Sequence, residues 1–378
     1  MSDQYTEITT QGWGQRIGGG FVALLLGLLL LPASLGVLYW NEGRAVTAAT
    51  ALRTGAATII EADPNALDPG HDGKLVHLTG MMQPATPAQD PEFGVSAAGL
   101  VRLRRHVETY QWQQTTSSHS QESVGGTKTT ETTYSYAPVW SGQQINSAGF
   151  RHPEGHENPP VTLHNADFYG GAVTLGAYRV TPELLAKVSV FTPVHPESAR
   201  PPLGFHAEGD GFYRGQDPAR PEIGDVRVQY SGVPAQTISV AAAQSGGGLT
   251  VFRDSGGYGI ALAEPGAVTA AALFKDAQHQ ASQITWLVRG GGFFGVLVGF
   301  LCLTRPLTLL FAVVPLLESV VGAGAFLVAL TLSVPVTLVT IALAWMAHRP
   351  VLGGGLLVAA VVSLVVLRRL HPRRALPA

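Results

Sequence analysis

One hydrophobic block, residues 290–367, constrains this chain more than any other feature. The block contains only three charged side chains, Arg305, Glu318 and Arg349. It is too long to be a single buried helix of a soluble domain. Because a helix needs about 20 apolar residues to cross the hydrocarbon core of a bilayer, the block has room for three crossings. The sequence therefore predicts a chain that is anchored in a membrane.

Charges and prolines inside the block set the expected ends of its helices. Arg305 and Pro306 are expected to end the first span, because proline interrupts the helical hydrogen bonds. His348, Arg349 and Pro350 form a minimal turn before the last span. The predicted elements are transmembrane helices at 286–304, 320–346 and 351–367, and an interfacial or re-entrant segment at 305–319.

A second apolar run, residues 17–40, follows a short polar N-terminus at 1–16. The run is longer than the core of a usual signal peptide, and no small-residue cleavage site follows it. A transmembrane helix is therefore favoured over a cleaved signal. Tyr39 and Trp40 end the run as aromatic anchors at the membrane interface. Residues 41–44 are expected to form a tight, solvated polar turn.

Four spans place both chain ends on the same side of the membrane. The C-terminal tail, residues 368–378, carries four arginines, and such an excess marks the cytoplasmic side. Residues 41–285 are then predicted to form an extracytoplasmic domain that is tethered at both ends. The net charge of −2 gives no indication of a nucleic-acid partner. The single cysteine, Cys302, lies in a predicted span, so the domain is expected to have no disulfide bonds.

The residues between the two anchors favour a mostly β domain. Residues 99–116 alternate as a strand does, and residues 132–140 are dense in aromatic and β-branched side chains. The Ser/Thr/Gln/Gly-rich residues 114–130 are expected to form a mobile hairpin loop between them. Residues 181–188 are expected to form a short helix. Further strands are predicted at 74–79, 172–180, 223–231, 237–243, 249–253 and 258–262.

These elements define the predicted fold class. We expect an α+β membrane protein with four transmembrane helices, one N-terminal and three C-terminal, and a large, mostly β extracytoplasmic domain. Gly291, Gly295 and Gly299 are four residues apart, so they form a smooth ridge on one helix face. Such ridges let two membrane helices approach closely, and we predict that this one packs against another helix.

Histidines and acids cluster in the Pro-rich loop around residue 155. Zinc accepts such ligands, but the prolines at 153, 159 and 160 disfavour the helix that would align them. A hydrogen-bonded structural loop is therefore expected, with no metal and no cofactor. The signatures of common hydrolases, G-x-S-x-G and H-E-x-x-H, are absent from the sequence. The possible ligands are His152, Glu154, His156, Glu157 and His164.

Several short motifs resemble those of the transmembrane protein 43 (LUMA) family. They occur in family order along almost the whole chain, at 40–44, 90–95, 108–112, 155–159 and 223–228. They are too specific for hydropathy alone to produce. The residues that carry them are Trp40, Asn41, Glu42, Gly43, Arg44, Gly155, His156, Asn158, Pro159, Gly224, Asp225 and Arg227.

The resemblance implies one N-terminal span, a large lumenal domain and a C-terminal membrane bundle. Animal members are linked to the endoplasmic reticulum and the inner nuclear membrane, where they are implicated in membrane organisation through lamins and emerin, and in self-association. The composition of this chain, rich in Ala, Gly and Pro, indicates a bacterial source. The nuclear partners therefore do not carry over, and the family supplies no catalytic residues to transfer.

The function predicted from these observations is that of a non-enzymatic scaffold in the bacterial inner membrane. The protein is expected to organise the membrane by binding lipid and by associating with itself or with a membrane protein partner. A channel or transporter component is the first alternative. An enzyme with an unrecognised site in the β domain is the second alternative.

Overall fold

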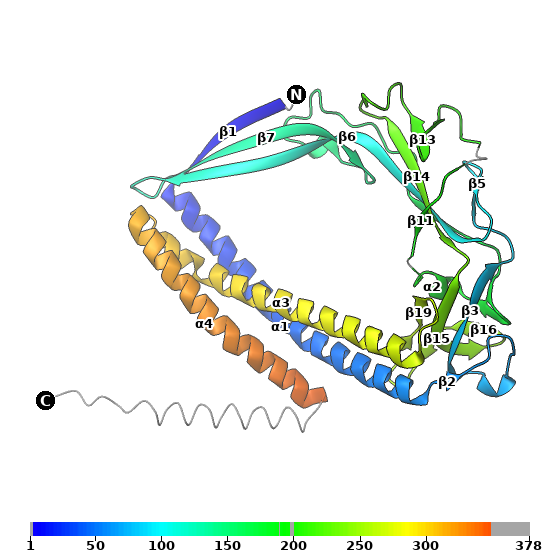
Figure 1. Ribbon diagram of the computed structural model, residues 1–378. Helices are drawn as coiled ribbons and strands as arrows, with labels where there is room; N and C mark the ends of the chain where they lie inside the picture. Colours follow the sequence, from blue (N-terminus) through cyan, green and yellow to red (C-terminus); the bar gives the residue numbers. More distant parts are fainter. Residues whose placement is uncertain (1–2, 189, 197–199, 349–378) are drawn as a thin grey trace. The chain divides into compact units, whose positions relative to one another are not determined.

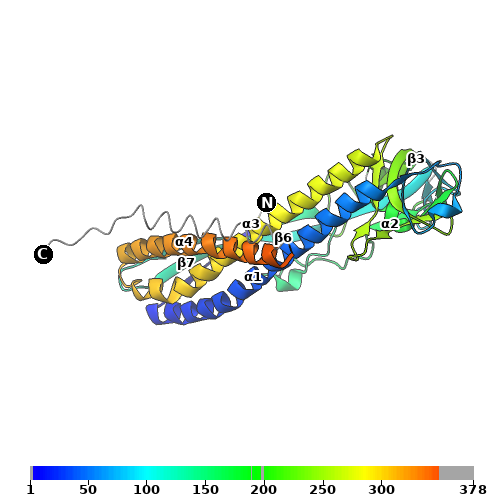
Figure 2. The ribbon, with the colours of Figure 1, turned by 90° about the horizontal axis from the view of Figure 1, so that it is seen from below.

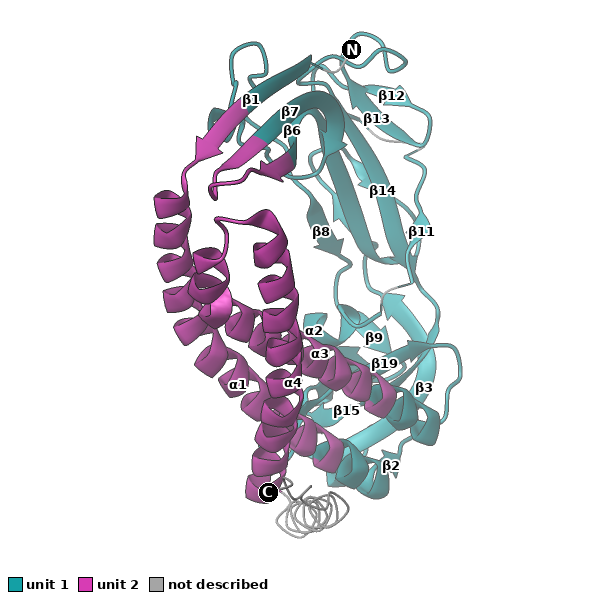
Figure 3. Ribbon diagram, turned by 90° about the vertical axis from the view of Figure 1, so that its left-hand side faces the viewer, with its two compact units in different colours: residues 1–7, 51–118, 131–277 teal, residues 8–50, 119–130, 278–378 magenta. Residues whose placement is uncertain are grey.

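The computed structural model contains two compact units, which are coloured separately in Figure 3. Unit 1 comprises residues 1–7, 51–118 and 131–277, and unit 2 comprises residues 8–50, 119–130 and 278–378. The structure describes residues 3–188, 190–196 and 200–348. The last predicted span, 351–367, and the basic tail, 368–378, lie outside the described residues.

Three long helices account for most of unit 2. They are α1 (Trp13–Thr58), α3 (Ala270–Leu310) and α4 (Pro315–His348), and they run side by side in both views (Figures 1 and 2). Each is long and apolar enough to cross a membrane by length and composition. The predicted α+β class is confirmed, and the N-terminal helix and two of the three predicted C-terminal helices are present among the described residues.

The helices extend beyond the predicted spans. α1 has 46 residues and is about 69 Å long at 1.5 Å per residue, so it continues well past the polar residues 41–44. α3 runs through Pro306 to Leu310, so the separate interfacial segment expected at 305–319 is not seen. One proline removes only one helical hydrogen bond, here the one that the carbonyl of Cys302 would accept, so the helix can continue past Pro306. α4 then begins at Pro315. The first N–H of a helix has no acceptor within the helix, so a proline at this position costs no hydrogen bond.

The larger sheet has eight strands and is open. Its strands are β1 (Asp3–Gln11), β6 (Leu100–Glu122), β7 (Lys128–Ser141), β8 (Ala166–Tyr169), β11 (Thr192–Pro193), β12 (His206–Glu208), β13 (Gly211–Arg214) and β14 (Val226–Pro234). The order is β1-β7-β6-β14-β13-β12, with β11 on β14 and β8 on β6. β6 and β14 are antiparallel, and Val107 lies opposite Val228.

The second sheet has seven strands and contributes most of the buried aliphatic residues. Its strands are β2 (Ile60–Glu61), β3 (Leu75–Pro84), β9 (Val173–Leu175), β10 (Tyr178–Val180), β15 (Thr237–Ser245), β16 (Gly248–Thr250) and β19 (Leu262–Pro265). The order is β19-β15-β16-β10-β9-β3-β2, and β15 also pairs with β3. Short elements complete the unit: β4 (Gln89–Asp90), β5 (Val95–Ser96), α2 (Pro182–Leu185), β17 (Phe252–Arg253) and β18 (Gly259–Ile260).

Two apolar clusters form the core of unit 1. The first lies on the seven-stranded sheet and includes Leu78, Tyr178 and Ile238. The second lies on the eight-stranded sheet and includes Phe93 and Phe212. Burial of this apolar area, at about 25 cal/mol per Å², is the main stabilising contribution to a unit that has no cysteine.

The long hairpin is more regular than predicted. β6 continues to Glu122 and β7 begins at Lys128, so the mobile loop expected over 114–130 is reduced to residues 123–127. Hydroxyl pairs join the two strands across the predicted loop: Ser118 with Thr132 (3.2 Å) and Ser120 with Thr130 (2.9 Å). Alternating Ser and Thr can thus form a ladder of cross-strand hydrogen bonds, although their polarity favours a loop.

Two other expectations differ from the structure. Residues 1–16 are not a simple polar tail, because β1 occupies Asp3–Gln11 and pairs with β7. The single strand expected at 172–180 is a hairpin, in which β9 and β10 pair across a turn at Gly176. Gly176 has φ of +60°, and a Cβ built on it would lie 2.0 Å from the carbonyl oxygen of Pro64.

The turn at Gly176 provides a stability test with a matched control. Gly155 also has positive φ (+79°), but it faces open space. Gly155→Ala is expected to cost about 1 kcal/mol for the backbone conformation alone, or roughly 2–4 °C in apparent melting temperature. Gly176→Ala adds the collision with Pro64, so we expect at least twice that shift in a thermal unfolding scan of the full chain in detergent. Equal shifts for the two variants would contradict the described turn.

Candidate functional site

The polar segment 41–44 lies inside α1, not in a turn. Asn41 is fully buried, and Glu42 is 1% exposed. The prediction of a solvated juxtamembrane turn is therefore wrong. The helix continues because the neighbouring helices supply partners for these side chains, which the local sequence does not show.

Glu42 is held by one residue from each of the other two long helices. Nε and Nη2 of Arg289, on α3, donate to the two carboxylate oxygens of Glu42, each at 2.7 Å. The indole N–H of Trp345, on α4, donates to Oε2 of Glu42 at 2.6 Å. This bidentate, charge-assisted geometry is the strongest way to satisfy a buried carboxylate.

Aromatic rings cover the guanidinium of this ion pair. The Cζ atom of Arg289 lies 4.8 Å from the ring centroid of Trp286 and 5.9 Å from that of Trp345. A cation over an aromatic face is attracted by the ring quadrupole, by about 0.5–2 kcal/mol. Arg289 is therefore held by a carboxylate and by two indole rings.

The neighbours of Glu42 make a second set of contacts with α3. The side-chain amide of Asn41 donates to the backbone carbonyl of Thr285 at 3.2 Å. Nη2 of Arg44 donates to Oδ1 of Asn41 (3.1 Å) and to the hydroxyl of Thr285 (3.4 Å). Each polar side chain of the segment thus has a partner on α3 or within α1.

Gly43 and Trp40 complete the segment in different ways. A Cβ at Gly43 would lie 2.8 Å from Nε2 of His348, so a larger residue there would require this α4 side chain to shift. The ring of Tyr39 packs edge-on against His348, with centroids 6.0 Å apart. Trp40 is 63% exposed.

We call the set Asn41, Glu42, Arg44, Thr285, Arg289 and Trp345 the polar cluster.

Two of the three predicted ridge glycines contact α1. They follow the polar cluster along α3. A Cβ at Gly295 would lie 2.3 Å from Oγ of Ser34, and one at Gly299 would lie 2.7 Å from Cγ of Leu31. On α1, a Cβ at Gly27 would lie 2.8 Å from the carbonyl oxygen of Gly299. The backbones approach closely at Gly27 and Gly299 because neither residue has a side chain, and the glycines of α3 leave room for Ser34 and Leu31 of α1.

The third ridge position differs from the prediction. Gly291 faces open space, and the contact is made by Gly292, where a Cβ would lie 2.5 Å from Leu38. The contacting face of α3 is therefore 292, 295 and 299, which follows three- and four-residue steps. This spacing is that of a helix winding around its neighbour, whereas a strict four-residue step drifts off the contact.

The motif residues at 155–159 lie in unit 1, against the long hairpin. The ring of His156 stacks on Tyr136 (centroids 4.1 Å apart), and its Nδ1 lies 3.1 Å from the carbonyl oxygen of His152. Asn158 bonds both the N–H and the carbonyl of Trp112 on β6, at 2.7 and 2.9 Å. These side chains fix a loop to the edge of a strand.

The motif residues at 224–227 also act within unit 1. Gly224 has φ of +98°, and its position would bring a Cβ to 3.2 Å from Pro159. Asp225 accepts a hydrogen bond from the hydroxyl of Tyr213 at 2.5 Å, and burial together with this bond raises the pKa of Tyr213. The guanidinium of Arg227 pairs with Glu108 (2.6 Å) and lies 4.5 Å from the ring centroid of Trp140.

The histidines and acids of the Pro-rich loop are not arranged as a metal site. No group of three or more His, Cys, Asp or Glu residues able to hold an ion occurs among the described residues. His152 stacks on Tyr5, with centroids 4.4 Å apart, and His164 contributes its carbonyl to Arg105 (3.4 Å). The loop is hydrogen bonded to the strands around it.

Two buried charge networks were not found from the sequence. In unit 1, Asp90 is fully buried and accepts from Arg105 (2.9 Å) and from the hydroxyl of Tyr230 (2.7 Å). Burial and the Asp90 carboxylate raise the pKa of Tyr230. In unit 2, Arg16 donates to Glu318 (2.7 Å) and Glu122 (2.7 Å). The only sequence signal was the isolation of Glu318 in an apolar block.

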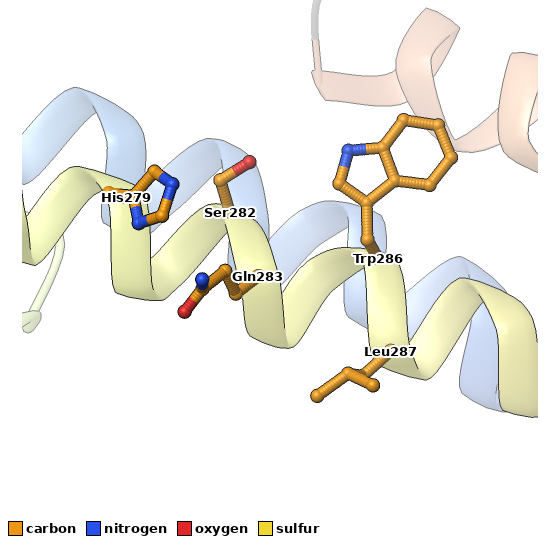
Figure 4. Close-up of a pocket in the computed structure, with 5 residues that line it drawn as sticks. All are labelled: His279, Ser282, Gln283, Trp286 and Leu287. Carbon is orange, nitrogen blue, oxygen red and sulfur yellow. The ribbon is translucent and has the colours of Figure 1, made fainter.

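A surface pocket of about 560 Å³ lies beside the polar cluster, along one face of α3. Figure 4 shows its lining residues, all from this single helix: His279, Ser282, Gln283, Trp286 and Leu287. Trp286 and Leu287 are 66% and 74% exposed. The face combines polar side chains toward the start of the helix with apolar ones further along, as expected near a membrane boundary.

Comparison with known proteins places these residues in a family. A family model described as transmembrane protein 43 matches residues 109–350. Transmembrane protein 43 of Homo sapiens is 32% identical, over 97% of this chain and 94% of its own length. The chain belongs to the transmembrane protein 43 family. The Mus musculus protein is 29% identical over 99% of this chain, and the Drosophila melanogaster homolog is 31% identical over 89% of this chain. No solved structure matches.

Membership of the transmembrane protein 43 family confirms the resemblance drawn from the motifs. Together with three apolar helices, it shows that the chain is a membrane protein. The motif at 40–44 is the place where α1 joins α3 and α4. The motifs at 155–159 and 224–227 are the places where loops of unit 1 join its larger sheet.

The polar cluster gives a test of stability. Glu42→Ala leaves the guanidinium of Arg289 without a carboxylate, which is expected to cost about 3–5 kcal/mol. The exposed Arg53, on the same helix, serves as control, and Arg53→Ala is expected to change stability by less than about 0.5 kcal/mol. The apparent melting temperature in detergent measures the effect of each variant.

A double variant separates the loss of the pair from the cost of an unpaired charge. Glu42→Leu with Arg289→Met removes both charges and is expected to be more stable than Glu42→Ala alone. If Glu42→Ala has the same apparent melting temperature as Arg53→Ala and the parent, the ion pair does not join the helices.

Proposed function

We propose that this chain is a non-enzymatic scaffold, which organises its membrane by associating with further copies of itself through its β-rich unit. In the bacterial cell that the composition indicates, this membrane is the inner membrane. The observation that carries the proposal is the edge of the larger sheet. β1 ends the strand order, is nine residues long and is exposed along almost its whole length.

An exposed edge strand offers unpaired N–H and C=O groups to another chain. Natural proteins usually protect such an edge with proline, with lysine or with a bulge. β1 has the sequence DQYTEITTQ, which contains neither proline nor lysine, and Ile8 on it is 70% exposed. Pairing of β1 with a strand of a second copy would extend the sheet, which is a common mode of recognition.

The roles of the family motif residues support a structural function. Glu42, Asn158, Asp225 and Arg227 all use their polar atoms to join elements of the same unit. A catalytic carboxylate needs a free oxygen within reach of a substrate proton. The Glu42 carboxylate instead receives three hydrogen bonds from Arg289 and Trp345.

Self-association is tested by native mass spectrometry of the purified full chain in nanodiscs. We expect dimers or higher oligomers in the parent. Ile8→Lys places a charge on the edge strand and is expected to raise the dissociation constant at least tenfold. Val124→Lys, at an 85%-exposed position in the hairpin turn, is the matched control and should leave it unchanged. A parent that is monomeric at all concentrations would contradict the proposal.

A channel or transporter component is the second candidate, and one observation favours it. Buried charges among apolar helices are functional candidates, and unit 2 contains the pairs Glu42–Arg289 and Arg16–Glu318. Conductance of planar bilayers containing the pure protein tests this candidate. Ion currents that Glu42→Ala abolishes would favour it over the scaffold.

A further inference from the structure

Two arginines on one face of the larger sheet share a single carboxylate. Arg102 and Arg104 are two residues apart on β6, so their side chains lie on the same face of the sheet. Asp167, on the neighbouring strand β8, lies opposite Arg104. Nε of Arg102 and Nε of Arg104 both donate to Oδ1 of Asp167, at 3.1 and 2.9 Å. Nη2 of Arg104 donates to Oδ2 at 3.3 Å, and Nη2 of Arg102 lies 3.1 Å from the same oxygen.

The charges of these three side chains do not cancel. Burial opposes the ionisation of Asp167, but its hydrogen bonds from Arg104 and Arg102 outweigh burial and hold the pKa of the carboxyl below its usual range. Asp167 is therefore ionised at neutral pH, and an arginine is always charged. Among the described residues, no other acidic side chain forms an ion pair with either arginine. Two positive charges thus face one negative charge.

Arg104 has donors to spare, although its position is fixed. Its Cζ atom lies 4.3 Å from the ring centroid of Phe191, and its side chain is 32% exposed. A guanidinium has five N–H groups. The contacts of Arg104 with Asp167 use Nε and Nη2, so the two N–H groups of Nη1 have no partner among residues 3–188, 190–196 and 200–348. These donors are available to a ligand.

A pocket of about 260 Å³ opens beside Arg104, inside unit 1. It is lined by Arg104 and His106 of β6 and by residues 165–167 at the start of β8. The ring of His106 is exposed and makes no hydrogen bond with a described residue. The side-chain oxygen of Asn165 accepts from the backbone N–H of Val107 at 2.7 Å, which leaves the amide N–H groups of Asn165 as donors. The lining therefore supplies three donor side chains and one carboxylate, whose oxygens already bind arginine.

We propose that this pocket binds a phosphate group, carried by a soluble phosphate ester or by the headgroup of an anionic lipid. The planar fork of an arginine matches the spacing of phosphate oxygens. A phosphate group has three strong acceptor oxygens, enough for one bond each from Arg104, His106 and Asn165, whereas a carboxylate has two oxygens in one plane. The negative charge of the phosphate balances the surplus positive charge of the two arginines.

Arg227 provides a matched control on the same face of the sheet. It lies opposite Glu108 in the pairing of β14 with β6, and its Nε donates to the Glu108 carboxylate at 2.6 Å. The charge of Arg227 is therefore balanced by a carboxylate of its own. Its side chain is 40% exposed, close to the 32% of Arg104, but it does not line the pocket.

The experiment is equilibrium dialysis of the purified full chain in detergent against radiolabelled inorganic phosphate, at constant ionic strength. We expect the parent to bind one phosphate per chain in a saturable manner. Arg104→Gln removes the donor fork and is expected to raise the dissociation constant at least tenfold, while Arg227→Gln is expected to change it less than twofold. A parent without saturable binding, or equal effects of the two variants, would overturn the proposal.

A variant with the opposite expected sign decides the question even if Arg104→Gln fails to fold. Asp167→Asn keeps the size of the side chain and removes the competing negative charge, so we expect the dissociation constant for phosphate to fall at least threefold. An unchanged or higher constant in a variant that unfolds cooperatively would contradict the proposal. The binding is measured per chain, so a monomeric parent that binds phosphate would refute the scaffold and support this site.

The two sources of the phosphate group are distinguished in nanodiscs. The parent and Arg104→Gln are placed in phosphatidylcholine discs, in discs with added phosphatidic acid, and in discs with the same fraction of phosphatidylserine. Labelled phosphate that the parent loses only with phosphatidic acid identifies a lipid headgroup as the ligand. Labelled phosphate that the parent retains in all three discs identifies a soluble ester. If the parent binds no more phosphate than Arg104→Gln in any disc, the proposal is wrong.

Discussion

The ion pair between Glu42 and Arg289 is the constraint on which the helical unit depends. An unpaired carboxylate among apolar helices is costly, and it becomes tolerable only when its oxygens are hydrogen bonded. Here both oxygens of Glu42 are bonded by Arg289, and one also by Trp345. Because the three residues come from three helices, α1, α3 and α4 cannot slide or rotate independently. Close packing at Gly295 and Gly299 then follows from a register that the ion pair has already set.

The same principle operates in the β-rich unit. Buried Asp90 binds Arg105 on β6 and Tyr230 on β14, so it joins two neighbouring strands of the larger sheet to the small β4–β5 ribbon. Asn158 similarly attaches a Pro-rich loop to β6. In both units, polar residues inside an apolar setting specify which elements meet, while burial of apolar surface provides most of the stability. Buried polar residues of this kind determine how helices, strands and loops are arranged, and they do not point to a chemical reaction.

The sequence predicted what depends on local patterns. The apolar helices, the strands around Leu103 and Val228, and the close contact of α3 near Gly295 all follow from hydropathy, alternation or residue size. The sequence did not predict contacts between distant residues. Glu42 and Arg289 are 247 positions apart, and Glu42 and Trp345 are 303 apart. Because these partners are not visible in the local sequence, residues 41–44 were predicted to form a solvated turn. β1 was missed for the same reason, since its partner strand begins more than a hundred residues later.

Residues 41–44 lie inside a continuous helix, with Asn41 and Glu42 buried and the Glu42 ion pair holding the segment against α3. Hydrogen–deuterium exchange of the full chain in nanodiscs measures this most directly. We expect the backbone amides of these residues to exchange as slowly as those of the apolar run 22–31, and Glu42→Ala to speed their exchange at least tenfold. Rapid exchange of residues 41–44 in the parent, as in a solvated turn, would contradict it.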